Sequence, residues 1–122
     1  MEIKNINEVP SFTTKDGSEI RELLAYRNSS IRLHSLAEAR LPGGASTTPH
    51  YHKRAEEVYY ILAGSGDMQI GHELRRVGPG DAIAIPPGKV HQITALGVET
   101  LKFLCTCAPA YEHEDTVLVD SF

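Results

Sequence analysis

The sequence predicts an all-β domain, either a sandwich or a barrel. Its 122 residues show no sustained helical periodicity of apolar side chains. Short runs of β-branched and aromatic residues instead alternate with turns that are rich in glycine and proline. Many short strands separated by such turns are typical of antiparallel sandwiches and barrels.

The expected strands follow these runs in order. They are residues 20–24, 31–41, 58–63, 67–70, 81–85, 91–95 and 101–107. The turns between them contain the breakers Pro42-Gly43-Gly44, Gly64-Ser65-Gly66, Gly78-Pro79-Gly80, Pro86-Pro87-Gly88 and Gly97.

The chain is long enough to bury a core without disulfide bonds, and no linker or repeat divides it. We expect one domain over residues 1–122, with a conserved barrel at 30–108, an N-terminal arm or extra strand at 1–29 and a C-terminal tail at 109–122.

Alternation along the 58–63 run assigns its two faces. The inner face would carry Glu57, Tyr59 and Ile61. The outer face carries Val58, Tyr60 and Leu62, which are also apolar. A strand that is apolar on both faces needs cover on its outer side. We therefore expect an N-terminal strand or a second subunit to cover it, and we predict a homodimer.

The last expected strand directs Leu101, Phe103, Cys105 and Cys107 toward the core. One residue separates the two cysteines, and a disulfide across it would close a very tight loop. We expect two free thiols that behave as small hydrophobic side chains, in a reduced, cytoplasmic protein.

Four potential metal ligands lie in two frames of glycine and proline. The frames are Gly44-x5-His50-x-His52-x4-Glu57-x6-Gly64 and Gly80-x5-Pro86-x-Gly88-x2-His91. His50 and His52 lie at positions i and i+2, so on a strand both point to the same face. Three imidazoles and one carboxylate suit a borderline divalent metal such as Zn, Mn, Fe or Ni.

The two frames resemble the paired motifs of the cupin superfamily, whose small domains are double-stranded β-helix, or jelly-roll, barrels. The first motif matches from Gly44 to Gly64 and the second from Gly80 to His91. One departure is Ala95, at a position where the family usually has an asparagine that is not a ligand.

The resemblance implies that one divalent transition metal is held by His50, His52, Glu57 and His91. Such a ligand set would leave one or two open positions for water, substrate or dioxygen. Glu56 competes with its neighbour as the carboxylate ligand, but the spacing to the following glycine favours Glu57.

Tyr59 is the candidate catalytic residue. It follows Glu57 by two strand positions and would share its face, so its phenol could act as an acid, a base or a hydrogen-bond donor. The simpler interpretation is a buried core tyrosine whose hydroxyl is satisfied by a neighbour.

Charge and hydropathy exclude other classes of partner. The net charge is −4 and the basic residues are scattered, which is unlike a nucleic-acid-binding surface. The N-terminus lacks the apolar segment of a signal peptide, and the 58–63 run is too short to span a bilayer. The expected partner is a small molecule.

We interpret the chain as a metal-dependent enzyme of the dioxygenase, isomerase or lyase type. Its substrate would be a small oxygen-rich or carboxylate-bearing molecule that binds at an open metal position. The alternative is a non-catalytic, metal-containing module that binds a sugar or a carboxylate. A protonatable group within reach of the open position would favour the enzyme.

Overall fold

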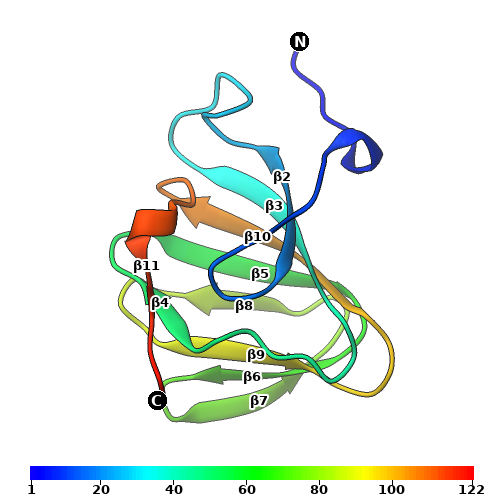
Figure 1. Cartoon of the computed structure of the whole chain (residues 1–122), viewed down its shortest axis with the longest axis vertical. Coiled ribbons are helices and arrows are strands. Elements are labelled where there is room, and N and C mark those ends of the chain that lie inside the picture. The colour runs from blue at the N-terminus through cyan, green and yellow to red at the C-terminus, as the bar shows by residue number, and fades with distance from the viewer.

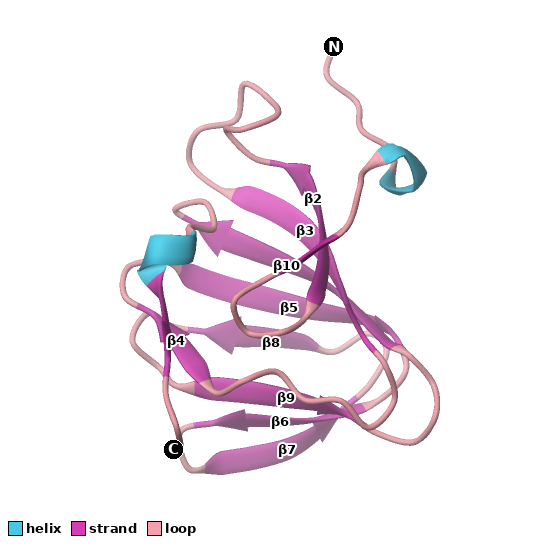
Figure 2. Cartoon of the chain, viewed as in Figure 1, coloured by secondary structure: helices cyan, strands magenta, loops and turns pink.

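Two antiparallel sheets enclose a common interior in the computed structural model, which describes residues 1–122. The larger sheet has six strands in the order β1-β2-β3-β10-β5-β8, and the smaller has five in the order β11-β4-β9-β6-β7. Figure 1 shows the two layers, and Figure 2 shows that strands and loops make up nearly the whole chain. The predicted all-β, jelly-roll architecture is confirmed.

The strand bounds are as follows. The larger sheet contains β1 (Phe12–Thr13), β2 (Glu19–Leu24), β3 (Ser35–Leu41), β5 (Glu56–Ala63), β8 (Ala82–Ile85) and β10 (Leu101–Ala108). The smaller sheet contains β4 (His50–His52), β6 (Gly66–Ile70), β7 (Glu73–Val77), β9 (His91–Ala95) and β11 (Thr116–Leu118). Two short 3-10 helices are η1 (Ile6–Glu8) and η2 (His113–Asp115). Neither helix has the length and hydropathy that crossing a membrane requires.

All seven expected strands are present, but one begins later than predicted. The strand expected from residue 31 starts at Ser35, and Leu33 before it is 80% exposed. Of the other four strands, β1 falls where an arm or extra strand was expected and β4 carries the two histidines assumed to lie on a strand, whereas β7 and β11 were not expected. β7 carries little apolar sequence and forms because it pairs along its whole length with β6 in a hairpin. β1 and β11 are too short to show a pattern and depend on their partners β2 and β4.

Alternation along β5 and β10 builds the core. Tyr59 and Ile61 are buried between the sheets, as are the four residues that were expected to face inward on β10. The outer residues Val58, Tyr60 and Leu62 are 42%, 44% and 40% exposed. The N-terminal strand β1 pairs with β2 at the edge of the sheet, so it does not cover them.

Glycines of the two frames form turns in which a residue with a side chain would be strained. Gly64 ends β5 with φ of +79°, and a Cβ there would lie 2.7 Å from the carbonyl oxygen of Thr100. Gly88 has φ of +78°, and its N–H donates to the carbonyl oxygen of His52 at 2.8 Å. This second bond ties the turn before β9 to strand β4.

A turn near the N-terminus and the C-terminal tail lie at one mouth of the barrel. The turn between β1 and β2 lies in front of the sheets in Figure 1, while the first residues extend away from them. The C-terminal tail folds back, and β11 pairs with β4 in antiparallel register. Asp115 and Thr116 in this tail are buried.

Candidate metal centre

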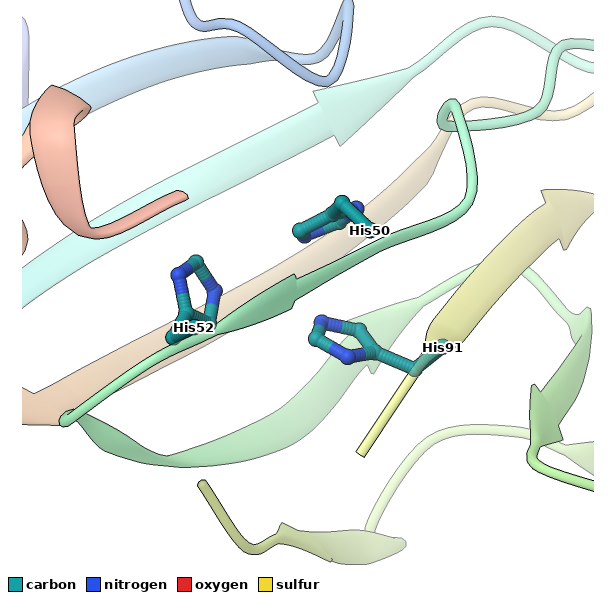
Figure 3. A group of neighbouring side chains, drawn as sticks. All are labelled: His50, His52 and His91. Atoms are coloured by element: carbon teal, nitrogen blue, oxygen red, sulfur yellow. The ribbon is translucent and has the colours of Figure 1, made fainter. Parts of the chain in front are cut away.

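Three histidines converge at the barrel mouth. His50 and His52 project from β4, and His91 projects from β9 beside it (Figure 3). The antiparallel register sets His50 directly opposite His91, with ring centroids 4.2 Å apart. One ligand atom of each histidine lies within 4.8 Å of the other two. All three side chains are buried, so the cluster is shielded from bulk water.

Hydrogen bonds at Nδ1 orient the rings so that Nε2 points to the interior. Nδ1 of His50 donates to the carbonyl oxygen of Thr48 at 2.7 Å, and Nδ1 of His91 donates to that of Lys89 at 2.9 Å. Each of these bonds places the proton on Nδ1, because a carbonyl oxygen can only accept. The Nε2 lone pairs are therefore available to a metal.

His52 is held in the same tautomer by a side chain. Its Nδ1 lies 3.1 Å from Oγ1 of Thr116, and that hydroxyl donates its own hydrogen to the carbonyl oxygen of Glu112. The hydroxyl oxygen must therefore accept the Nδ1–H of His52. The third imidazole thus also offers Nε2 to the interior.

Glu57 supplies a carboxylate to the cluster. Its Oε1 lies 3.1 Å from Nε2 of His52 and 3.5 Å from Nε2 of His91. Its Oε2 accepts a hydrogen bond from the thiol of Cys107 at 3.3 Å. Glu56 is exposed on the opposite face of β5, so the alternative carboxylate does not reach the histidines.

The electrostatics of this group favour a bound cation. Burial alone would raise the pKa of Glu57, but the adjacent imidazoles of His52 and His91 lower it to about 2. Burial lowers the pKa of His52, and Glu57 more than offsets this, so the pKa is raised overall. In addition, Nε2 of His91 is buried without a hydrogen-bond partner. A divalent metal would satisfy both the orphaned nitrogen and the carboxylate, so these residues fit the implied ion.

Tyr59 lies beside this cluster on the inner face of β5. Its ring is 6.1 Å from that of His91 and 4.5 Å from that of Phe103, measured between centroids. Burial raises the pKa of its phenol well above the usual value, so the group stays protonated. Tyr59 therefore has both a packing contact and a position on the wall of the cavity.

A cavity extends from the histidines along the inner face of the larger sheet. Its volume is about 40 Å³, and an outer recess of about 450 Å³ shares part of its wall. Phe12 and Tyr111 line both spaces. The hydroxyl of Tyr111 is buried without a hydrogen-bond partner. The inner space therefore admits only a small group, while a larger molecule could extend into the recess.

Sequence reasoning missed several residues around the cluster. Asp16, Tyr111 and Thr116 line the cavity, although they come from the N-terminal turn and the C-terminal tail. No spacing links them to the two frames, because folding of the chain ends brings them there. The other histidines, His34, His72 and His113, are exposed and lie outside the cluster. The two cysteines are free, as expected.

Comparison with known proteins identifies the family. Residues 37–107 match the sequence profile of the cupin domain. The chain is 44% identical over 114 residues to an uncharacterized protein of Methanocaldococcus jannaschii, an alignment that covers 93% of this chain and 91% of that protein. It is 30% identical over 86 residues to an oxalate-binding protein of Thermotoga maritima, covering 70% and 71% of the two chains.

Solved structures agree on the fold. The structure of KdgF from Halomonas sp. superposes with a TM-score of 0.79, at 21% identity, over 93% of this chain and 98% of that one. The chain belongs to the cupin family. It is a cupin with a cluster of three histidines, a group suited to a metal ion.

Proposed function

We propose that this cupin is a metal-dependent enzyme that acts on a small oxygen-rich or carboxylate-bearing molecule. One divalent metal, Mn, Fe, Zn or Ni, would be held by His50, His52, Glu57 and His91. The observation that carries the proposal is the orientation of the three imidazoles, each bonded through Nδ1 and directed through Nε2 toward the shared interior, where Nε2 of His52 contacts Glu57. When bound, such a metal polarises a substrate oxygen or activates dioxygen.

The residues around the cluster support catalysis over simple binding. Glu57 brings negative charge among the imidazoles, and the thiol of Cys107 holds its second oxygen. Tyr59 and Tyr111 place two phenols on the cavity wall, where a protonated hydroxyl can donate to a substrate oxygen. The apolar remainder of the wall limits access of water to this space.

The alternative is a non-catalytic module that binds a sugar or a carboxylate through the metal. The narrow inner cavity is compatible with it, and one relative is named for oxalate binding. The two free cysteines support the further proposal of a reduced, cytoplasmic location.

Elemental analysis of protein purified without an affinity tag tests the proposed metal site. We expect one equivalent of a divalent metal per chain, directly or after reconstitution. His52→Ala should lose most of it, because a ligand and its Thr116 contact disappear together. His72→Ala, in an exposed turn, is the matched control and should keep it. Wild-type protein that stays metal-free after reconstitution would exclude the proposal.

A further inference from the structure

Asp16 brings a second carboxylate to the mouth of the barrel. It lies in the turn between β1 and β2. Its Oδ1 accepts three hydrogen bonds, from Oγ1 of Thr14 at 2.7 Å, from the N–H of Ser18 at 2.9 Å and from the hydroxyl of Ser18 at 2.7 Å. Its Oδ2 is left free of these bonds and lies 3.6 Å from Nε2 of His50. The free oxygen therefore faces the histidine cluster.

The turn that carries Asp16 is anchored to the residues that hold the histidines. The N–H of Thr48 donates to the carbonyl oxygen of Asp16 at 2.8 Å, and Thr48 also holds His50. The ammonium of Lys15 donates to the carbonyl oxygen of Thr116 at 2.8 Å, and Thr116 also holds His52. Shared anchors on both sides keep the carboxylate at a defined place beside the cluster.

The lining of the cavity contains no lysine or arginine to balance this carboxylate. The same lining includes Asp16, Glu22 and Glu57. The outer recess contains one arginine, Arg27. Arg27 is already bonded to Glu22 at 2.9 Å, to a carboxylate oxygen of Glu112 at 3.0 Å and to the carbonyl oxygen of Tyr111 at 2.8 Å. Apart from the metal itself, the lining of the two spaces therefore offers no lysine or arginine that lacks a protein partner.

We propose that Asp16 is a specificity-determining residue, which disfavours carboxylate ligands at the metal centre and selects small neutral molecules that carry hydroxyl groups. The inference rests on the proposed metal site and narrows its substrate class. An anion beside Oδ2 is repelled in a buried site where water screens little. A hydroxyl group can instead donate a hydrogen bond to the same oxygen.

Two probe molecules with the same carbon skeleton separate the effect of charge from that of shape. Glycolate and glycolamide both carry a hydroxyl group, but only glycolate is an anion. Each would be titrated into tag-free protein loaded with Co(II), and binding would be followed by the visible spectrum of the metal. We expect Asp16→Asn to raise the ratio of glycolate affinity to glycolamide affinity by about tenfold or more.

Controls identify the cause of such a shift. Asn retains the oxygen that accepts from Thr14 and Ser18, so the turn should persist, and thermal unfolding checks this. Asp16→Ser removes the same charge and should shift the ratio in the same direction. Asp67→Asn, on the outward side of β6 and paired with Arg76, should leave the ratio unchanged.

Three outcomes would overturn the inference. An unchanged ratio in metal-loaded Asp16→Asn would show that the carboxylate does not set specificity. A loss of Co(II) affinity of about tenfold or more, measured by chelator competition, would make Asp16 a ligand of the metal instead. Failure of the wild type to hold Co(II) would reject the proposed function and this inference with it.

Discussion

The thiol of Cys107 is a residue-scale feature that joins the core to the candidate ligands. It donates to Oε2 of Glu57 at 3.3 Å, while Oε1 faces the imidazoles. Burial raises the pKa of this thiol, so the hydrogen stays on sulfur and remains available to donate. Cys107 is buried as expected, and its thiol in addition contacts a candidate ligand.

Replacing Cys107 should weaken metal binding through Glu57. Cys107→Ala removes the donor and should lower metal affinity by about tenfold, whereas Cys107→Ser retains a donor and should lower it less. Competition with a coloured chelator measures both. Cys105→Ala is the control, because Cys105 is also buried on β10 but has no hydrogen bond to Glu57. Equal affinities for all three variants would contradict this positioning role.

Tyr59 can be tested separately for packing and for proton transfer. Tyr59→Phe keeps the ring against Phe103 and removes only the hydroxyl, so the free energy of unfolding should change by less than about 1 kcal/mol. Once an activity is assigned, we expect kcat to fall by about tenfold to a hundredfold while metal content is retained. Tyr60→Phe, on the outer face of β5, is the matched control. If Tyr59→Phe retains the kcat of the wild type, the role of Tyr59 is limited to packing.

At the element scale, the C-terminal tail stabilises the loop that connects His52 on β4 to Glu57 on β5. The carboxylate of Asp115 accepts the N–H of Arg54 at 2.9 Å and that of Ala55 at 3.0 Å. The next residue, Thr116, begins β11 and orients His52. A short segment that lies outside both sequence frames thus organises the ligand loop.

Removing the carboxylate of Asp115 should destabilise this loop. Asp115→Ala leaves two backbone N–H groups without an acceptor, and one belongs to buried Ala55, so the free energy of unfolding should fall by about 1–3 kcal/mol. Urea denaturation of the metal-free protein measures this. The neighbouring Glu114→Ala is exposed and should change stability by less than about 0.5 kcal/mol. Equal stability of the two variants would argue against the capping role.

On the scale of the whole molecule, the outer face of the larger sheet has no cover within one chain. It presents Val58, Tyr60 and Leu62 to solvent. A second copy of the chain packed there would bury these residues, so the homodimer stays a prediction that this face supports.

Sedimentation equilibrium at micromolar concentration tests the dimer. We expect a mass near twice 13.4 kDa for the wild type. Tyr60→Asp should shift the equilibrium toward monomer, because it places a charge in the middle of the apolar face. Leu74→Asp is the control, since Leu74 is 63% exposed on β7 of the other sheet. A wild-type monomer would remove the dimer from consideration.

The sequence by itself determined the fold class, the strands of the core and the candidate ligands. These features are local, because alternation, turn glycines and ligand spacing act within a few residues. The spacing to Gly64 favoured Glu57 over Glu56, and the structure places Glu57 on the buried face of β5 and Glu56 on the exposed one. The two frames were therefore sufficient to predict that the histidines cluster and that Tyr59 points inward.

Only the tertiary structure decided what surrounds the cluster. Asp16 and Thr116 are 100 positions apart in the chain, yet both contact its histidines, through Oδ2 at 3.6 Å from His50 and Oγ1 at 3.1 Å from His52. Such contacts depend on how the N-terminal turn and the C-terminal tail close over the barrel. No periodicity or spacing encodes that closure, because it results from long-range pairing of β11 with β4 and from the bonds that anchor the turn. The charge at the mouth of the site, and with it the proposed specificity, is therefore a property of the folded chain.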